Sequence, residues 1–347
     1  MNHDLYMTRA LELASLGRGF VSPNPMVGCV IVYDDRTGPR IIGEGWHQRY
    51  GEAHAEVNAI QSVRPDDAHL LPEATVYVTL EPCSHFGKTP PCADLLIEKR
   101  ARRVVVCNDD PNPLVAGRGF AKLRAARIAV ETGVLAERGR ELNRRFFTQM
   151  EQKRPYVILK WAETSDGFIG GPGGRQVAIS GPLSQRLVHQ WRAEEPAILV
   201  GTNTARTDNP RLNVRLWNGP NHTRIVIDKA GQLPATLNLF DGSQPTLIYT
   251  HQVARQEGLN TFVHLSAQEP LLPQLLTDLH SRGFQSVFVE GGANLLRSFL
   301  EAGFWDEMRV FRSPKLLGEG VKAPVVRGQL ISREMVENDE LSIYRAV

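Results

Sequence analysis

The chain has 347 residues, enough for about two domains of roughly 150 residues each. Hydrophobic residues make up 42% and charged residues 22% of the chain, which are ordinary globular values and exclude a disordered or collagen-like protein. Forty Lys and Arg against thirty-eight Asp and Glu give a net charge of +2, too balanced for a protein that binds mainly nucleic-acid backbones.

The N-terminal half alternates helical patterns with short apolar runs. Leu and Ala recur at helical spacing over 3–17, and Gly17 is a typical helix C-cap. The short apolar runs predict strands over 27–32, 75–79 and 103–107, and helical patterns cover 54–63, 93–100 and 135–147. This alternation predicts an α/β fold with helices on both faces of the sheet.

A polar stretch over 149–155, closed by Pro155, separates the two halves. It predicts two domains, 1–148 and 149–347, both of ordinary size. The second half restarts the alternation, with strands predicted over 156–161, 197–200, 224–227, 246–249, 286–289 and 308–311, and helices over 183–192, 271–282 and 293–300. The halves do not resemble each other, so we expect two α/β domains with different roles. No element or motif is predicted after Lys322.

Four cysteines, Cys29, Cys83, Cys92 and Cys107, occur in a chain whose first residues show no apolar secretion signal. No apolar run reaches the roughly 20 residues that span a bilayer. These features predict a reducing cytoplasm, where cysteines are core residues, metal ligands or nucleophiles. Cys29 and Cys107 lie inside apolar runs and are expected to be core residues.

The run His54-Ala55-Glu56, followed by Cys83 and Cys92 after prolines, has the residue types of a zinc site. One imidazole and two thiolates leave a fourth position for water, which is the catalytic arrangement. Zinc lowers the pKa of such a water to about 7, and Glu56 is available to move its protons. Zinc nucleobase deaminases carry H-x-E with a later P-C-x-x-C, whereas eight residues separate the cysteines here.

Two alternatives to a catalytic zinc site stay open. His85 would be the fourth ligand of a structural zinc site. A chain without metal would use His54 as a helix cap or core residue and both cysteines as small core residues. We favour the catalytic site, because Cys83 and Cys92 each follow a proline in a loop-like segment.

Four segments of the first half closely resemble the deaminase half of the bifunctional riboflavin-biosynthesis deaminase–reductase family. They are 23–30 (PNPMVGCV), 45–47 (GWH), 51–56 (GEAHAE) and 80–92 (LEPCSHFGKTPPC). In that family a long insert between the cysteines is the norm. The resemblance covers essentially residues 1–147 and implies a cytidine-deaminase-like α/β/α domain.

The resemblance implies roles for the matching residues. His54, Cys83 and Cys92 would hold one zinc ion, and Glu56 would be the catalytic proton shuttle. The implied substrate contacts are Asn24 and His47 at the pyrimidine, His85 and Lys88 at the phosphate, and Asp110 and Asn112 at the wall of the site. The reaction would be hydrolytic: activated water attacks the ring carbon that bears the exocyclic amine, and Glu56 protonates the departing ammonia.

In the second half, Gly291-Gly292 separates a predicted strand from a predicted helix, and such a helix start suits a phosphate or pyrophosphate. The fingerprint G-x-G-x-x-G of a conventional Rossmann domain is absent. The segments 165–167, 189–192, 201–215, 289–292 and 314–318 resemble the reductase half of the same family, from about Pro155 to about Pro324. This resemblance implies a dihydrofolate-reductase-like α/β domain that uses NADPH.

The same resemblance implies the reductase contacts. Substrate would be bound by Gln176, Arg192, Leu212, Arg215 and Glu290, with the two guanidinium forks matched to phosphate oxygens. NADPH would contact Ala162, Ala178, Thr204, Asp208 and the turn formed by Gly292, Ala293, Asn294, Leu295, Leu296, Arg297 and Ser298. Asp208 would also be catalytic, by assisting protonation of the opened sugar. Lys229, just after a strand-like run, is a candidate for binding the 2′-phosphate.

One segment departs from the family pattern. Members often carry Ser-x-Trp-Ile-Thr where this chain has Gln176-Val177-Ala178-Ile179-Ser180. Trp161 or Trp191 would then supply the aromatic contact. An active deaminase with a degenerate reductase domain is the alternative that this departure suggests.

The resemblance implies two consecutive steps of riboflavin biosynthesis. Zinc-dependent deamination would convert 2,5-diamino-6-(5-phosphoribosylamino)pyrimidin-4-one to 5-amino-6-(5-phosphoribosylamino)uracil, and NADPH-dependent reduction would convert the ribosyl chain to ribityl. We expect a small phosphorylated pyrimidine as substrate, no nucleic-acid or membrane partner, a cytoplasmic location, and a homo-oligomer (dimer or tetramer). Two other classes of protein are alternatives. One is a nucleic-acid-editing deaminase, which the balanced charge disfavours. The other is a non-catalytic interaction protein whose fold depends on a structural zinc ion, so that chelation would unfold it.

Overall fold

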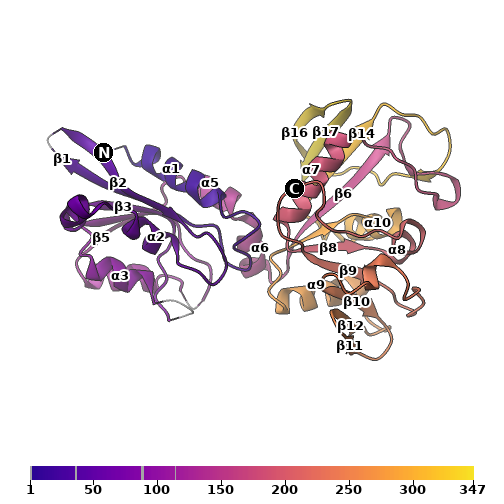
Figure 1. The fold of residues 1–347 in the computed structure, drawn as a ribbon, viewed down its shortest axis with the longest axis horizontal. Helices are drawn as coiled ribbons and strands as arrows, with labels where there is room; N and C mark the ends of the chain where they lie inside the picture. Colours follow the sequence, from indigo (N-terminus) through magenta and orange to yellow (C-terminus); the bar gives the residue numbers. More distant parts are fainter. Residues whose placement is uncertain (1, 36, 87–89, 114) are drawn as a thin grey trace. The chain divides into compact units, whose positions relative to one another are not determined.

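The computed structural model describes residues 2–35, 37–86, 90–113 and 115–347. The chain divides into two compact units (Figure 1). The first ends at Gln152 and the second begins at Lys153. The domain boundary expected after residue 148 falls inside helix α6 (Arg144–Gln152), which continues to the end of the first unit.

The first unit is built on a five-stranded sheet with the order β2-β1-β3-β4-β5. Strand β1 is antiparallel to both of its neighbours, and β3, β4 and β5 are parallel to one another. The strands are β1 (Gly28–Asp35), β2 (Gly38–Trp46), β3 (Thr75–Leu80), β4 (Arg103–Asn108) and β5 (Ala129–Thr132). The helices are α1 (His3–Ser15), α2 (Ala55–Gln61), α3 (Cys92–Glu98), α4 (Arg118–Ala125), α5 (Ala136–Leu142) and α6, with a 3-10 helix at Pro65–Glu73.

Alternate strand residues of this sheet pack against different helices. Cys29 and Ile31 of β1 pack in one core with residues of α2, α3 and α4, whereas Val30 and Val32 pack in another with residues of α1 and Leu142 of α5. This period of two places helices on both faces, as the alternation predicted. Cys29 and Cys107 are fully buried core residues, which confirms the prediction made for them.

The helical stretch expected over 135–147 consists of two helices. Asn143 separates them with φ −102° and ψ 25°. Its buried side chain accepts a hydrogen bond from the Met26 N–H (2.9 Å) and donates one to the Met26 carbonyl (2.8 Å). This pairing with a distant backbone segment ends α5, and α6 then starts one residue later.

The second unit contains a ten-stranded sheet with the order β11-β12-β10-β9-β8-β13-β6-β14-β17-β16. The strands from β12 to β14 in this order are parallel, and β11, β17 and β16 pair antiparallel with their neighbours. The strands are β6 (Tyr156–Thr164), β8 (Ala197–Val200), β9 (Thr223–Ile227), β10 (Thr246–Thr250), β11 (Arg255–Glu257), β12 (Asn260–His264), β13 (Ser286–Val289), β14 (Glu307–Ser313), β16 (Gln329–Val336) and β17 (Asp339–Arg345).

Helices cover both faces of this sheet as well. Helices α9 (Leu271–Ser281) and α10 (Ala293–Ala302) pack on one face, and α7 (Pro182–Glu194) and α8 (Thr202–Asp208) pack on the other. A separate two-stranded sheet joins β7 (Phe168–Gly170) to β15 (Val321–Lys322), and short 3-10 helices lie at Pro172–Gly174 and Asn238–Phe240.

The last 25 residues hold two strands that we did not predict. Strand β17 pairs with β14 from Glu307↔Arg345 to Arg312↔Glu340, and β16 lies outside it at the edge of the sheet. Seven of the eight β16 residues are exposed, so the strand carries no buried alternation that a pattern search would detect. Among the described residues, no helix has the length and apolar character that a membrane crossing requires.

Candidate functional site

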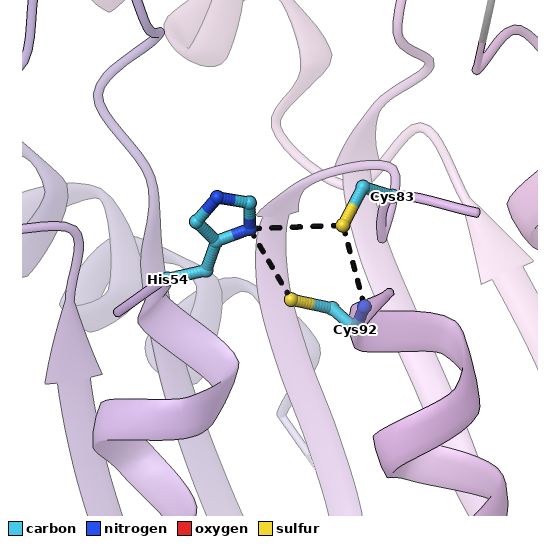
Figure 2. A group of neighbouring side chains, drawn as sticks. All are labelled: His54, Cys83 and Cys92. Carbon is cyan, nitrogen blue, oxygen red and sulfur yellow. Dashed lines mark hydrogen bonds between the residues drawn. The ribbon is translucent and has the colours of Figure 1, made fainter. Parts of the chain in front are cut away.

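Three side chains that could together hold a metal ion converge in the first unit (Figure 2). His54 is the N-cap of α2, Cys92 is the first residue of α3, and Cys83 follows β3 in a loop. The ligand atoms of all three lie within 4.8 Å of one another. His54 Nδ1 is 3.6 Å from Cys83 Sγ and 3.4 Å from Cys92 Sγ. In the part of the chain that the structure describes, this is the one such group, and His85 does not belong to it.

The chemistry of this group fits a zinc ion. Hydrogen bonds from Cys92 and His54 hold the pKa of the Cys83 thiol well below its usual range, and the thiolate is the form that binds metal. The Cys92 backbone N–H also donates to Cys83 Sγ (3.3 Å). The hydrogen bond to Cys83, and then burial, raise the pKa of Cys92, and burial raises the pKa of Cys29 and Cys107. One imidazole and two thiolates form a three-residue donor set, which matches a catalytic site with an open position.

A cavity of about 290 Å³ adjoins the ligands. Glu56, in the first turn of α2, lines it and is only 4% exposed, and burial raises the pKa of its carboxyl group. The cavity also brings together the expected substrate contacts Asn24, His47, His85, Asp110 and Asn112. Lys88 lies outside the described residues.

His47 and Asn24 form a pair with a defined donor and acceptor. His47 Nδ1 is 3.1 Å from the Ala53 carbonyl, so this nitrogen carries the proton and donates. Nε2 is therefore the acceptor for the Asn24 side-chain amide at 3.0 Å. Burial lowers the pKa of His47, which keeps the imidazole neutral in this arrangement. The Asn24 amide is thereby held at the cavity wall.

Asp110 and Asn112 lie beyond the end of β4, next to the loop that follows β3. Because β3 and β4 are parallel, the segments after their carboxyl ends meet at one edge of the sheet. The Asp110 carboxylate accepts a hydrogen bond from the Asn112 N–H (2.8 Å), and burial raises the pKa of Asp110 to about 6.

Sequence reasoning missed part of the cavity wall. Tyr50, Glu81, Phe146 and Met150 line it without having been assigned a role. The two α6 residues lie far beyond the motifs and look like ordinary helix core residues. Glu81 could have been found from the sequence. It directly follows the buried strand β3 (Thr75–Leu80), and an acidic residue is unusual at such a position.

The second unit gathers its expected cofactor residues at the carboxyl edge of neighbouring parallel strands. Ala162 lies near the end of β6, Gly292 follows β13, and Thr204 lies in the first turn of α8 after β8. The Gly201 N–H donates to the Gly291 carbonyl (2.8 Å), which joins the two turns. Gly291 has φ +109°, a conformation that residues with side chains rarely adopt.

The two turns leave a space between Gly292 and Thr204, which we call the cradle. A Cβ atom on Gly292 would come within 2.9 Å of Thr204 Oγ1, so only glycine leaves this space open. Gly292 is the N-cap of α10 and has no side-chain cap, so the first N–H groups of the helix are available to an anion. Of the expected contacts that follow, Leu295 and Leu296 point into the core, and Arg297 donates to the Lys322 carbonyl (2.8 Å).

Arg192 and Glu290, expected as separate substrate contacts, form a two-point ion pair. Arg192 Nε and Nη2 lie 2.6 and 2.9 Å from the two Glu290 carboxylate oxygens. Lys160 Nζ, on β6, is 3.7 Å from the same carboxylate. Although burial disfavours the charged form, these two cations lower the pKa of Glu290 to about 2. Lys160 was missed, although a lysine inside the apolar run Tyr156–Trp161 signals a buried charge.

The other expected reductase residues are more scattered. Arg215 is exposed, and its Nη1 donates to Asn213 Oδ1 (3.2 Å). The Leu212 side chain is 2% exposed and lies in the core, so the side chain itself is turned away from solvent. Burial raises the pKa of Asp208, at the end of α8. Lys229 is exposed just after β9, and Gln176 and Ala178 are exposed in the stretch before α7, in which Ile179 is buried.

Two motifs of the second half serve the fold. The Asp166 carboxylate accepts hydrogen bonds from the backbone N–H groups of Leu317 (3.1 Å) and Gly318 (2.7 Å). The Ser165 backbone N–H also donates to the Lys315 carbonyl (3.0 Å), so the segments 165–167 and 314–318 are held together by Ser165 and Asp166, which explains the Asp-Gly turn without a ligand.

Comparison with known proteins covers both units. The family "Cytidine and deoxycytidylate deaminase zinc-binding region" matches residues 1–108, and the family "RibD C-terminal domain" matches residues 155–345. The chain is 39% identical to the riboflavin biosynthesis protein RibD of Aquifex aeolicus, over 91% of this chain and 88% of that protein. It is 37% identical to RibD of Escherichia coli, over 93% and 90% respectively.

Two solved structures are similar over nearly the whole chain. RibD of Acinetobacter baumannii superposes with a TM-score of 0.90 at 33% identity, covering 99% of each chain. The diaminohydroxyphosphoribosylaminopyrimidine deaminase/5-amino-6-(5-phosphoribosylamino)uracil reductase of Thermotoga maritima superposes with a TM-score of 0.89 at 36% identity, also covering 99% of each. A cytidine-deaminase-like unit followed by a reductase unit, as expected, is confirmed.

Proposed function

The chain belongs to the RibD family, and from this premise we propose that it catalyses two consecutive steps of riboflavin biosynthesis. The first unit deaminates the phosphoribosylated diaminopyrimidinone, and the second reduces the ribosyl chain of the product to ribityl. The observation that carries the proposal is the convergence of His54, Cys83 and Cys92 beside the cavity that Glu56 lines, in a chain that also has a reductase unit.

In the first unit, His54, Cys83 and Cys92 would hold the zinc ion. When bound there, zinc supplies Lewis acidity that makes water a nucleophile near neutral pH. The buried Glu56 carboxylate takes a proton from the attacking water and returns it to the exocyclic nitrogen. The net change is addition of water at the ring carbon and release of ammonia, which leaves the uracil carbonyl.

The cavity residues would hold the substrate for this reaction. The Asn24 amide, fixed by the neutral His47, is a hydrogen-bonding group for the pyrimidine edge. Asp110 and Asn112 form the facing wall, and His85 and Lys88 are proposed for the phosphate.

In the second unit, the cradle at Gly292 and Thr204 fits the backbone of a dinucleotide at the start of α10. NADPH bound there supplies the hydride. Glu290, held by Arg192 and Lys160, is proposed to face the ribosyl chain, and Arg215 to bind its phosphate. Asp208 remains the proposed proton donor, and Lys229 the proposed contact of the 2′-phosphate.

Nothing among the described residues favours a degenerate reductase. In the departing segment 176–180, Gln176 and Ala178 are exposed and Ile179 is buried, and the ion pair of Arg192 with Glu290 and the cradle at Gly292 are intact. A homo-oligomer and a cytoplasmic location stay predictions.

The test is product mass spectrometry on the phosphoribosylated diaminopyrimidinone, with zinc present and with or without NADPH. We expect ammonia release without NADPH, and the reduced ribityl product only with it. Deamination that proceeds no further with NADPH would contradict the reductase assignment. Absence of deamination by folded, zinc-loaded protein would contradict the first step.

The variant Glu56→Gln separates the two units. Loss of the proton shuttle should slow deamination by about 100-fold or more, because general acid–base catalysis is worth that much. Reduction of the ribosyl chain, assayed with the deaminated uracil compound as substrate, should be unchanged. Glu73→Gln, at an exposed position of the same unit outside the cavity, is the matched control and should deaminate normally. Loss of both activities in folded Glu56→Gln protein would overturn the two-site proposal.

A further inference from the structure

Glu81 is a buried carboxylate that accepts hydrogen bonds from backbone N–H groups of a distant segment. It is 4% exposed. Oε1 accepts from the N–H groups of Gly119 (2.9 Å) and Phe120 (3.3 Å), and Oε2 accepts from Gly117 (3.0 Å) and, at the limit of hydrogen bonding, Asp110 (3.5 Å). Among the described residues, no Lys, Arg or His forms an ion pair with it. Its contacts therefore all run to one backbone segment.

That segment contains the start of helix α4. Gly117 is the N-cap of α4, has φ +74° and offers no side chain to satisfy the first helical N–H groups. Gly119 and Phe120 are the second and third residues of the helix, the positions that a capping side chain normally serves. Glu81 supplies this cap from the loop after β3, and its negative charge suits the positive end of the helix.

The same contact joins two parts of the deaminase site. Glu81 stands two residues before the ligand Cys83, and the segment that it holds begins with Asp110 and Asn112 at the cavity wall. The approach is close: a Cβ on Gly119 would lie 2.2 Å from the Pro82 carbonyl oxygen. Glu81 thus fixes the spacing between the ligand loop and the substrate wall.

We propose that Glu81 is a positioning residue of the deaminase site, which holds Asp110 and Asn112 against the bound pyrimidine through its hydrogen bonds to Asp110 and to the start of α4. This inference rests on the proposed function of the first unit. It predicts that loss of the carboxylate weakens substrate binding while leaving the metal site and the second unit intact.

The test is the variant Glu81→Gln, in which an amide NH2 replaces an acceptor oxygen and faces N–H donors. We expect the deaminase KM to rise by about tenfold or more and kcat to change less, because the lost contacts position bound substrate. Zinc content should stay at that of the wild type, and reductase activity should be unchanged. Glu81→Asp, which keeps both oxygens on a shorter side chain, should show an intermediate KM and replaces Glu81→Gln if that variant does not fold.

Two controls distinguish positioning from a general loss of stability. Asp67→Asn removes another buried carboxylate of the same unit, which pairs with Arg40 (2.6 Å) and Arg64 (3.1 Å) outside the cavity, and should leave KM unchanged. In an Asn112→Ala background, Glu81→Gln should add little further increase in KM, because both changes affect the same wall.

Two outcomes would overturn the role of Glu81: a wild-type KM in the folded variant, including one whose activity falls only because zinc is lost, or an equal effect of Asp67→Asn on KM. A wild-type protein that releases no ammonia would instead overturn the proposed function. The two failures are therefore distinguishable.

Discussion

His222 is an imidazole enclosed in the second unit, where it is 5% exposed. Its Nδ1 lies 3.1 Å from the Arg192 carbonyl and donates to it. Burial, and then the nearby Arg192 charge, lower the pKa of His222 to about 4. Burial also lowers the pKa of His189 to about 4. Both residues are therefore neutral in the folded protein at pH 7.

These shifts predict loss of stability in acid. An unfolded histidine has a pKa of about 6.5, so the unfolded chain takes up protons first as the pH falls from about 6.5 to about 4. The free energy of unfolding should fall in this window by about 1.4 kcal/mol per pH unit for each such histidine. Urea unfolding followed by tryptophan fluorescence measures it, since Trp46 is the one tryptophan outside the second unit.

The variant His222→Gln should reduce the slope of the unfolding free energy against pH by the contribution of about one proton. His264→Gln, at an exposed position of the same unit, should leave the slope unchanged. An unaltered slope in His222→Gln would mean that His222 is not held neutral by burial.

Gly292 allows a second test at the scale of one residue. Its φ of −74° is open to any residue, so Gly292→Ala acts only through the Cβ that would meet Thr204 Oγ1 at 2.9 Å. We expect the KM for NADPH to rise by about tenfold, because the cradle for the cofactor is filled. Deamination by the same variant is the control. An unchanged KM for NADPH would remove the cradle from the cofactor site.

At the scale of secondary structure, two helices are capped by acidic residues from other parts of the chain. Glu81 caps α4, and Asp339 of β17 caps α7 by accepting from the Gly181 N–H (2.7 Å) and the Ser184 hydroxyl (2.6 Å). Gly181, the N-cap of α7, has no side chain that could do this itself. The C-terminal strand therefore stabilises the helix that carries Arg192.

Asp339→Ala should lower the free energy of unfolding of the second unit by about 1–3 kcal/mol, because buried donors lose their acceptor. The KM for the reductase substrate should rise as well, since α7 presents Arg192 to Glu290. Glu340→Ala, at the neighbouring half-buried position, is the control. Equal effects of the two variants on the substrate KM would contradict a specific role for the cap.

At the scale of the whole molecule, each unit has its own sheet and its own apolar cores. The core of the first unit does not depend on His54, Cys83 or Cys92 for its packing, apart from the buried start of α3. A chelator that removes zinc should therefore abolish deamination, leave reduction intact and leave the first unit folded. Circular dichroism and both activity assays check this. Unfolding of the first unit on chelation would indicate a structural metal site.

The sequence could predict the parts of this protein that depend on local pattern. Short apolar runs such as those of β1 and β3 alternate along the chain with helical patterns, and this order yields the α/β class and the core cysteines directly. The ligand set His54, Cys83 and Cys92, with Glu56 beside it, is readable because zinc chemistry requires those residue types. Their convergence within 4.8 Å agrees with that prediction, while their catalytic roles stay proposals.

Only the tertiary structure decided which distant groups share one buried environment. The division of α5 from α6 depends on Asn143 binding the Met26 backbone, and the order of β16 and β17 depends on pairing with β14. The hydrogen bonds of Glu81 to the start of α4 and the cluster of Lys160, Arg192 and Glu290 are of the same kind. These contacts join residues far apart in the chain. Burial of well-paired polar groups keeps these contacts, against the entropy cost of closing long loops, and neither effect leaves a periodic signal in the sequence.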